Sequence, residues 1–151
     1  MKNKSIISQL IIFVVIAAVF ILLGSSGSSP NINKEEEDMP KADKLEIYYF
    51  YATQRCDVCI TLENFIEETV NEYFSEELQS GIIIFDSINV DLPENREVVN
   101  KYQARGAALY INSIYDNKNH IQEEVNAWRY VNNKTQFKDY LSSKIKSGLN
   151  D

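Results

Sequence analysis

Residues 45–70 have the sequence LEIYYFYATQRCDVCITLENFIEETV, in which one periodicity gives way to another. Residues 45–52 form a short run rich in aromatic side chains, which favours a mostly buried β-strand. Further along, apolar side chains recur at positions 59, 62, 66, 70 and 73, with glutamates between them. That spacing predicts one long amphipathic helix over residues 56–78, ended by Ser80-Gly81. The junction between strand and helix therefore falls at Arg55-Cys56-Asp57-Val58-Cys59.

The rest of the chain also alternates between strand and helix patterns. Asp91, Glu94 and Asn95 are typical of the start of a helix, because their side chains and charges suit its unpaired N–H groups. The remaining predicted elements are a strand at 82–90, a short helix to about residue 103, strands at 107–115 and 121–125 around a polar turn at 116–119, and a last helix with Phe137, Tyr140, Leu141 and Ile145 on one face.

The order β-α-β-α-β-β-α predicts an α/β fold with a mixed four-stranded sheet. The first two strands are separated by a long helix, so we expect them to be parallel, with a right-handed crossover. The last two strands form an antiparallel hairpin. We expect the strand order 2-1-3-4 with three flanking helices.

The chain begins with a basic segment and an apolar run. Lys2 and Lys4 precede an uninterrupted run of apolar residues at 10–23, LIIFVVIAAVFILL. We interpret residues 1–23 as an uncleaved signal anchor, a single transmembrane helix; a cleaved signal peptide is the alternative. Under either interpretation the lysines stay inside and the remainder is exported. The domain would then lie outside the cytoplasm on the cell membrane, or be periplasmic or secreted if the segment is cleaved.

Residues 24–44 contain GSSGSSP and EEED, and such small, polar and charged types predict a flexible linker. The folded domain is expected at residues 45–149. All 22 acidic residues and 13 of the 15 basic ones follow the apolar run, a net charge of −9. So acidic a domain repels phosphate backbones, which argues against nucleic acid as a partner.

Both cysteines of the chain lie in the Cys56-x-x-Cys59 motif, so neither is left to link distant elements. At a helix start, unpaired N–H groups and the helix dipole stabilise a thiolate and lower its pKa from about 8.5 towards neutrality. Cys56 would be the exposed nucleophile, and Cys59, one turn further in, would resolve a mixed disulfide. A structural disulfide is the alternative, but so short a loop adds little constraint.

A C-x-x-C motif at the first strand–helix junction of this element order resembles the thioredoxin superfamily. The resemblance covers residues 45–148 and includes Val90-Asp91, Glu94-Asn95, Lys101-Tyr102 and Arg105-Gly106. It implies a thioredoxin-like three-layer sandwich and thiol–disulfide exchange. The segment Tyr49 to Thr53 with Arg55 and the two cysteines, together with Asn126-Ala127-Trp128, resembles more narrowly the small membrane-anchored bacterial proteins of the ArsF family. That narrower resemblance implies a link to nitroaromatic reduction or arsenical resistance.

The sequence departs from the thioredoxin pattern in three places. Thioredoxins have a cis-proline before the third strand, where this chain has Gly106-Ala107-Ala108-Leu109; because a non-proline cis bond costs about 2.5–4 kcal/mol, we expect a trans loop. Arg55 replaces the usual tryptophan, and Asp57-Val58 replace Gly-Pro. Tyr49 and Phe50 take the part of the strand that carries a buried acid in thioredoxins.

We therefore predict an extracytoplasmic, membrane-tethered thiol–disulfide oxidoreductase in which Cys56 attacks and Cys59 resolves. Arg55, Ala107 and Ala108 are the expected substrate-binding residues. No cofactor is required, since the dithiol carries the electrons. The expected partner is a thiol or disulfide protein, for which a membrane reductase or permease is a candidate.

The alternative function is binding of a metal or metalloid, or electron transfer, by an accessory protein of a detoxification system. Two close thiolates at Cys56 and Cys59 without a protective proline bind soft ions well. His120 is expected in the hairpin turn, far from the cysteines, and we predict no metal site that includes it.

Overall fold

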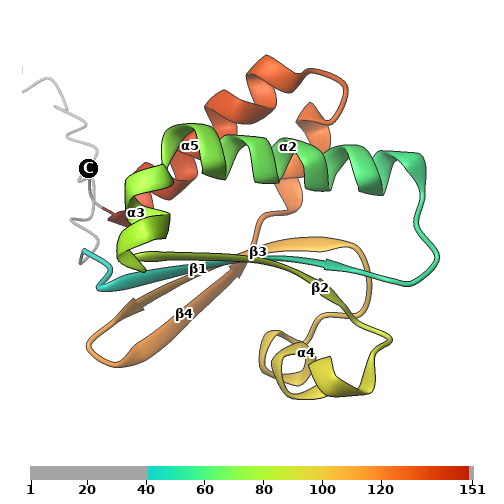
Figure 1. Cartoon of the computed structure of the whole chain (residues 1–151), viewed down its shortest axis with the longest axis horizontal. Helices are drawn as coiled ribbons and strands as arrows, with labels where there is room; N and C mark the ends of the chain where they lie inside the picture. Colours follow the sequence, from blue (N-terminus) through green and yellow to red (C-terminus); the bar gives the residue numbers. More distant parts are fainter. Residues whose placement is uncertain (1–40, 150–151) are drawn as a thin grey trace, which may run out of the picture. The chain divides into compact units, whose positions relative to one another are not determined.

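The computed structural model describes residues 41–149, which contain a four-stranded mixed sheet (Figure 1). The strands are β1 (Lys44–Tyr51), β2 (Ile83–Asn89), β3 (Ala108–Tyr115) and β4 (Lys118–Glu123), in the order β2-β1-β3-β4. The β1–β2 pair is parallel, whereas β1–β3 and β3–β4 are antiparallel. The predicted strand order and directions are confirmed.

Helices cover both faces of this sheet (Figure 1). The long helices α2 (Asp57–Tyr73) and α5 (Lys134–Leu149) pack on one face, and α4 (Arg96–Tyr102) packs on the other. The short elements are α3 (Ser75–Ser80) and the 3₁₀ turns η1 (Pro93–Asn95) and η2 (Val125–Tyr130). Three layers in this order, with a parallel β1-α2-β2 unit and an antiparallel hairpin, form a thioredoxin-like α/β fold.

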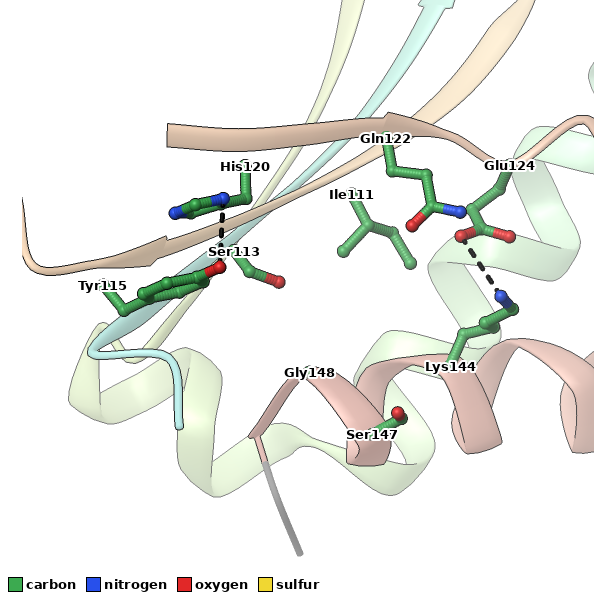
Figure 2. A pocket seen from close by; sticks show the side chains of 9 residues that line it. All are labelled: Ile111, Ser113, Tyr115, His120, Gln122, Glu124, Lys144, Ser147 and Gly148. Atoms are coloured by element: carbon green, nitrogen blue, oxygen red, sulfur yellow. Dashed lines mark hydrogen bonds and ion pairs between the residues drawn. The ribbon is translucent and has the colours of Figure 1, made fainter. Parts of the chain in front are cut away.

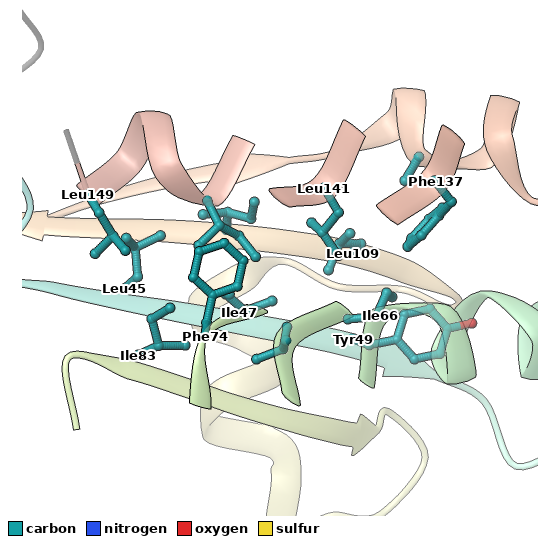
Figure 3. Packing of buried hydrophobic residues seen from close by; sticks show 14 of the residues in the cluster. Leu45, Ile47, Tyr49, Ile66, Phe74, Ile83, Leu109, Phe137, Leu141 and Leu149 are labelled. Atoms are coloured by element: carbon teal, nitrogen blue, oxygen red, sulfur yellow. The ribbon is translucent and has the colours of Figure 1, made fainter. Parts of the chain in front are cut away.

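The larger hydrophobic core lies between the sheet and the α2–α5 layer (Figure 3). Alternate residues of β1 point into it, because successive side chains of a strand face opposite sides of the sheet. The fully buried members from β1 are Leu45, Ile47 and Tyr49. A smaller cluster under α4 contains Phe50, Ile88, Tyr102 and Tyr110. Because β1 is covered on both faces, each residue of the run at 45–52 is either buried or half-buried, and none is exposed.

The predicted single helix over residues 56–78 is wrong in one respect, since the structure divides it at Phe74. The backbone of Phe74 is non-helical, with φ −134° and ψ 31°, and its side chain is only 3% exposed within the core. The apolar spacing continues past this point, so the sequence pattern does not reveal the break. The end of α3 is as predicted: Gly81 has φ +76°, a conformation that favours glycine.

The predicted hairpin turn at 116–119 is also wrong in its length. Only Asp116 and Asn117 form the turn, with φ 53° and 56°, and β4 already begins at Lys118. Two consecutive residues of positive φ give a tight two-residue connection that matches the twist of the strands. His120 therefore lies on β4, opposite Ser113 of β3, and not in the turn.

The predictions for residues 1–23 and for the linker up to residue 40 lie outside the described residues. Within residues 41–149, none of the helices is both long and apolar enough to span a membrane.

Candidate functional site

The loop between β1 and α2 carries the cysteines and is braced by the segment that follows β2. The Thr53 N–H donates a hydrogen bond to Asp91 Oδ2 at 2.8 Å, and Asn89 Nδ2 donates to Thr53 Oγ1 at 3.2 Å. The hydrogen bond from Thr53 lowers the pKa of Asp91. Asp91 therefore holds this loop and does not cap the next helix, whose preceding residue Leu92 makes no side-chain cap. The prediction of helix-start chemistry for Asp91 is wrong, because its carboxylate accepts from the Thr53 N–H of the cysteine loop.

Cys56 is the N-cap residue of α2 and forms a disulfide with Cys59. Their Cα atoms are 5.1 Å apart, and the Cys59 N–H donates to Cys56 Sγ at 3.1 Å. Cys56 is exposed, whereas Cys59 is half-buried. A backbone N–H group in the first turn of the helix thus points at the sulfur of Cys56, the more exposed of the two cysteines. This arrangement stabilises a thiolate.

Tyr49 of β1 is hydrogen-bonded to the first turn of α2. Its side chain is fully buried, and its hydroxyl donates to the Cys59 carbonyl oxygen at 2.9 Å. Burial raises the pKa of Tyr49 to about 12, and the nearby positive charge of Arg55 opposes that rise. Tyr49 is therefore a neutral hydrogen-bond donor at any physiological pH.

Arg55 and Glu63 form an ion pair beside the disulfide. Their side chains are only 23% and 15% exposed, and the Arg55 guanidinium carbon lies 4.2 Å from the centroid of the Tyr51 ring. Burial alone would lower the pKa of Arg55, but the hydrogen bond and charge of Glu63 outweigh it and raise that pKa. Sequence reasoning missed Glu63; its position four residues after Cys59 on one helix face is the signal that could have found it.

The predicted substrate-binding residues Ala107 and Ala108 lie at the end of the sheet where β1 leads into the cysteine loop. Ala108 is the first residue of β3, is buried, and pairs with Phe50 just before β1 leads into the cysteine loop. Ala107 precedes the strand and is half-buried. The peptide bonds from Gly106 to Ala108 are trans, as are all others in the described part of the chain.

A separate cavity of about 140 Å³ lies between β3, β4 and the end of α5 (Figure 2). Its one deeply buried charged group, Glu124, already accepts a hydrogen bond from Tyr140 and pairs with Lys144 at 3.7 Å. His120 lines this cavity and stacks on Tyr115, with ring centroids 3.7 Å apart. No residue of the disulfide site reaches this cavity, so we place the candidate functional site at the cysteines.

The described residues contain no group of three or more His, Cys, Asp or Glu side chains arranged to hold a metal ion. Within residues 41–149, the side chains around the disulfide offer two sulfurs, the paired carboxylate and guanidinium of Glu63 and Arg55, and the exposed carboxylate of Asp57. The arrangement can support thiol–disulfide exchange, or two-sulfur ligation of a soft ion once the disulfide is reduced.

No family model and no curated protein matches the chain significantly. Among solved structures, a thioredoxin from Thermus thermophilus is similar, with 15% identity, a TM-score of 0.43, and coverage of 70% of this chain and 76% of its own. The germline-specific thioredoxin Deadhead of Drosophila melanogaster has 19% identity and a TM-score of 0.41, and the match covers 67% of this chain and 81% of that one. A thioredoxin from Fasciola hepatica has 19% identity and a TM-score of 0.39, and the match covers 71% of this chain and 84% of that one. The fold assignment rests on the strand order and directions described above.

Proposed function

We propose that this protein is a thiol–disulfide oxidoreductase whose working group is the Cys56–Cys59 pair. One observation carries the proposal: Cys56 is an exposed residue at the N-terminus of α2, and its sulfur is already bonded to Cys59. The sulfur that the helix start favours as a thiolate is thus the one that a partner can reach.

In the exchange reaction, the Cys56 thiolate attacks a disulfide sulfur of the partner and releases the partner's other sulfur as a thiolate. Cys59 then loses its proton and attacks Cys56 Sγ, which forms the Cys56–Cys59 disulfide and releases the partner fully reduced. Two electrons pass from the dithiol to the partner. Every step is reversible, so a more oxidising Cys56–Cys59 disulfide would instead oxidise a partner dithiol.

Trapping of the mixed disulfide tests this function. In Cys59→Ser the first attack survives and resolution does not, so a Cys56-linked adduct should accumulate and disappear with dithiothreitol. Cys56→Ser is the matched control and should trap nothing. An adduct from Cys56→Ser alone would reverse the assigned roles, and no adduct from either variant would contradict the function.

We further propose that residues 1–23 tether this domain outside the cytoplasm, as in the ArsF-like proteins that the sequence resembles. The basic Lys2 and Lys4 before the apolar run support this orientation. An alkaline phosphatase fused after residue 30 should then be active, and a cytoplasmic reporter at the same place should not. Release of the mature protein by a carbonate wash would mean a cleaved signal in place of an anchor. The proposed partner is a membrane reductase or permease that exchanges electrons with the dithiol.

A second candidate function is binding of a soft ion such as trivalent arsenic by the reduced pair. The trans loop at Gly106–Ala108 favours it, because this loop brings no proline ring to the cysteine end of the sheet. Titration of the reduced protein with arsenite should then show one-to-one binding that either cysteine-to-serine variant abolishes. Weak binding, unchanged by those variants, would remove this candidate and leave the first.

A further inference from the structure

The inference concerns the state that follows reduction of the disulfide, and it rests on the proposed function. Arg55 carries one donor that its ion pair leaves unused. Its Nε is buried and has no hydrogen-bond acceptor in residues 41–149, although the same guanidinium bonds Glu63 through a terminal nitrogen and lies within hydrogen-bonding reach of the Tyr49 hydroxyl. Buried N–H donors almost always have a partner, so an orphaned one calls for an explanation.

Three observations place this guanidinium near the Cys59 turn. Glu63 follows Cys59 by four residues on α2, and helical side chains lean towards the N-terminus, so its carboxylate lies over that turn. Tyr49, which feels the charge of Arg55, is hydrogen-bonded to the Cys59 carbonyl. Arg55 itself directly precedes Cys56 in the chain. The guanidinium is thus held by a helix residue, a strand residue and its own backbone.

Reduction of the disulfide creates an acceptor that the oxidised form does not offer. A sulfur in a disulfide is a poor acceptor, whereas a thiolate carries a full negative charge and accepts strong hydrogen bonds from a cation. We propose that, once the Cys56–Cys59 disulfide is reduced, Arg55 donates its Nε–H to the thiolate of the pair and so favours the dithiol over the disulfide. Arg55 then acts on the redox pair itself, in addition to any contact with a substrate.

Among the residues that the structure describes, the other charged groups near the pair are Glu63, which is bonded to Arg55, and Asp57, which is exposed in the first turn of α2. Tyr49 is neutral at the pH of the test. A carboxylate beside a sulfur opposes the thiolate. Arg55 is therefore the one cation within this cluster that can favour the reduced form.

The test is the equilibrium of the full-length protein, kept in detergent, with glutathione at pH 7. Two glutathione molecules supply the two electrons and two protons that reduce Cys56–Cys59, and one glutathione disulfide forms. Arg55→Gln should shift this equilibrium about tenfold towards the protein disulfide, which corresponds to about 30 mV. Arg55→Lys keeps the charge but has no Nε–H, and should recover only part of the shift. Arg96→Gln, which removes an exposed arginine of α4, should leave the equilibrium unchanged.

Arg55→Gln also leaves Glu63 unpaired, and a free carboxylate could itself disfavour the thiolate. The double variant Arg55→Gln/Glu63→Gln removes that charge as well. Under the proposal the double variant stays shifted by about tenfold. A return to within twofold of the wild type would mean that Arg55 only cancels Glu63, and full recovery in Arg55→Lys would mean that charge suffices; either result overturns the proposed hydrogen bond.

The same measurement separates this inference from the proposed function. If glutathione cannot reduce the wild-type pair at any ratio, the oxidoreductase function fails and the inference fails with it. If the wild type exchanges readily and folded Arg55 variants match it, the inference alone fails. Circular dichroism of each variant reports whether it is folded, and Arg55→Lys is the fallback if Arg55→Gln is not.

Discussion

The buried hydroxyl of Tyr49, on the central strand β1, donates a hydrogen bond to the carbonyl of Cys59 in the first turn of α2. This contact joins the core of the sheet to the motif that carries the chemistry. It also ties the half-buried cysteine to a rigid strand, while Cys56 at the N-cap remains exposed. The two cysteines therefore differ in support as well as in accessibility.

Tyr49→Phe should lower the free energy of unfolding by about 1 kcal/mol, the usual net value of one buried hydrogen bond. The phenyl ring keeps the packing, so the loss reports the hydroxyl alone. Urea denaturation of the oxidised protein measures it. Tyr73→Phe, at a tyrosine that is 47% exposed, is the control and should change stability by less than about 0.5 kcal/mol. Equal effects in the two variants would contradict a structural role for the Tyr49 hydroxyl.

Glu46 of β1 links the sheet to α4 through hydrogen bonds. It accepts hydrogen bonds from Tyr102 at 2.6 Å, Asn112 at 2.8 Å and Lys101 at 2.9 Å. Burial alone would raise the pKa of Glu46, but these donors outweigh burial and lower it. A carboxyl whose pKa is lower in the folded than in the unfolded protein stabilises the fold fully at pH values above the unfolded-state pKa. This stabilisation is lost as the pH falls through the folded-state pKa.

Glu46→Gln should therefore cost about 1–2 kcal/mol at pH 7, since it removes the charge from these hydrogen bonds. The difference between variant and wild type should shrink as the pH falls below about 4.5, where the unfolded wild type begins to bind its proton. Urea denaturation at a series of pH values gives both results. Glu67→Gln removes an exposed carboxylate of α2 and is the control. A difference that is constant from pH 7 to pH 3 would contradict the lowered pKa.

Much of the fold follows from local pattern, because each strand and helix has its own periodicity. The run at residues 45–52 was predicted as a strand, and β1 occupies Lys44–Tyr51. The break at Phe74 could not be predicted, since its cause is tertiary: the ring enters the core while the apolar spacing continues. The two-residue turn at Asp116-Asn117 was missed because four polar residues follow one another and only the backbone reveals which of them turn.

The site was predicted as far as it depends on neighbours in sequence. A C-x-x-C motif after a strand places one sulfur at a helix start, and Cys56 is indeed the N-cap. The partners of Arg55 could not be predicted in the same way. The position of Glu63 four residues after Cys59 marks it as a neighbour of the motif, but its pairing with Arg55 and the stacking of Arg55 on Tyr51 also depend on how the loop returns over α2. Whether Arg55, Ala107 and Ala108 contact a substrate stays a prediction.

The hairpin turn gives a prediction about stability. Asn117 has φ 56°, a conformation that glycine adopts without steric cost and that suits glycine at the second position of such a turn. Asn117→Gly should therefore raise the free energy of unfolding by about 0.5 kcal/mol. Asn117→Ala, which keeps a Cβ and loses the asparagine's tolerance of this region, should lower it by about 1 kcal/mol. Thermal denaturation compares the two, and the opposite ranking would contradict the two-residue turn.

The last prediction concerns the reactivity of the two thiols. The N–H of Cys59 that points at Cys56 Sγ remains available after reduction, so the Cys56 thiolate should keep this donor and the helix dipole. We expect the pKa of Cys56 to lie below the ~8.5 of a free thiol. A pKa lower by one unit makes the thiolate about tenfold more abundant at neutral pH. Cys59 is half-buried and should react more slowly.

Alkylation by iodoacetamide, followed against pH, measures both thiols separately. Cys59→Ser leaves Cys56 alone and should react faster at pH 7 than Cys56→Ser, which leaves Cys59 alone. In urea the two variants should react at the same rate, because unfolding removes both the helix start and the difference in burial. Faster reaction of the folded Cys56→Ser variant would make Cys59 the nucleophile. Equal rates in the folded proteins would mean that the helix start does not activate Cys56, although the sulfur lies 3.1 Å from the Cys59 nitrogen.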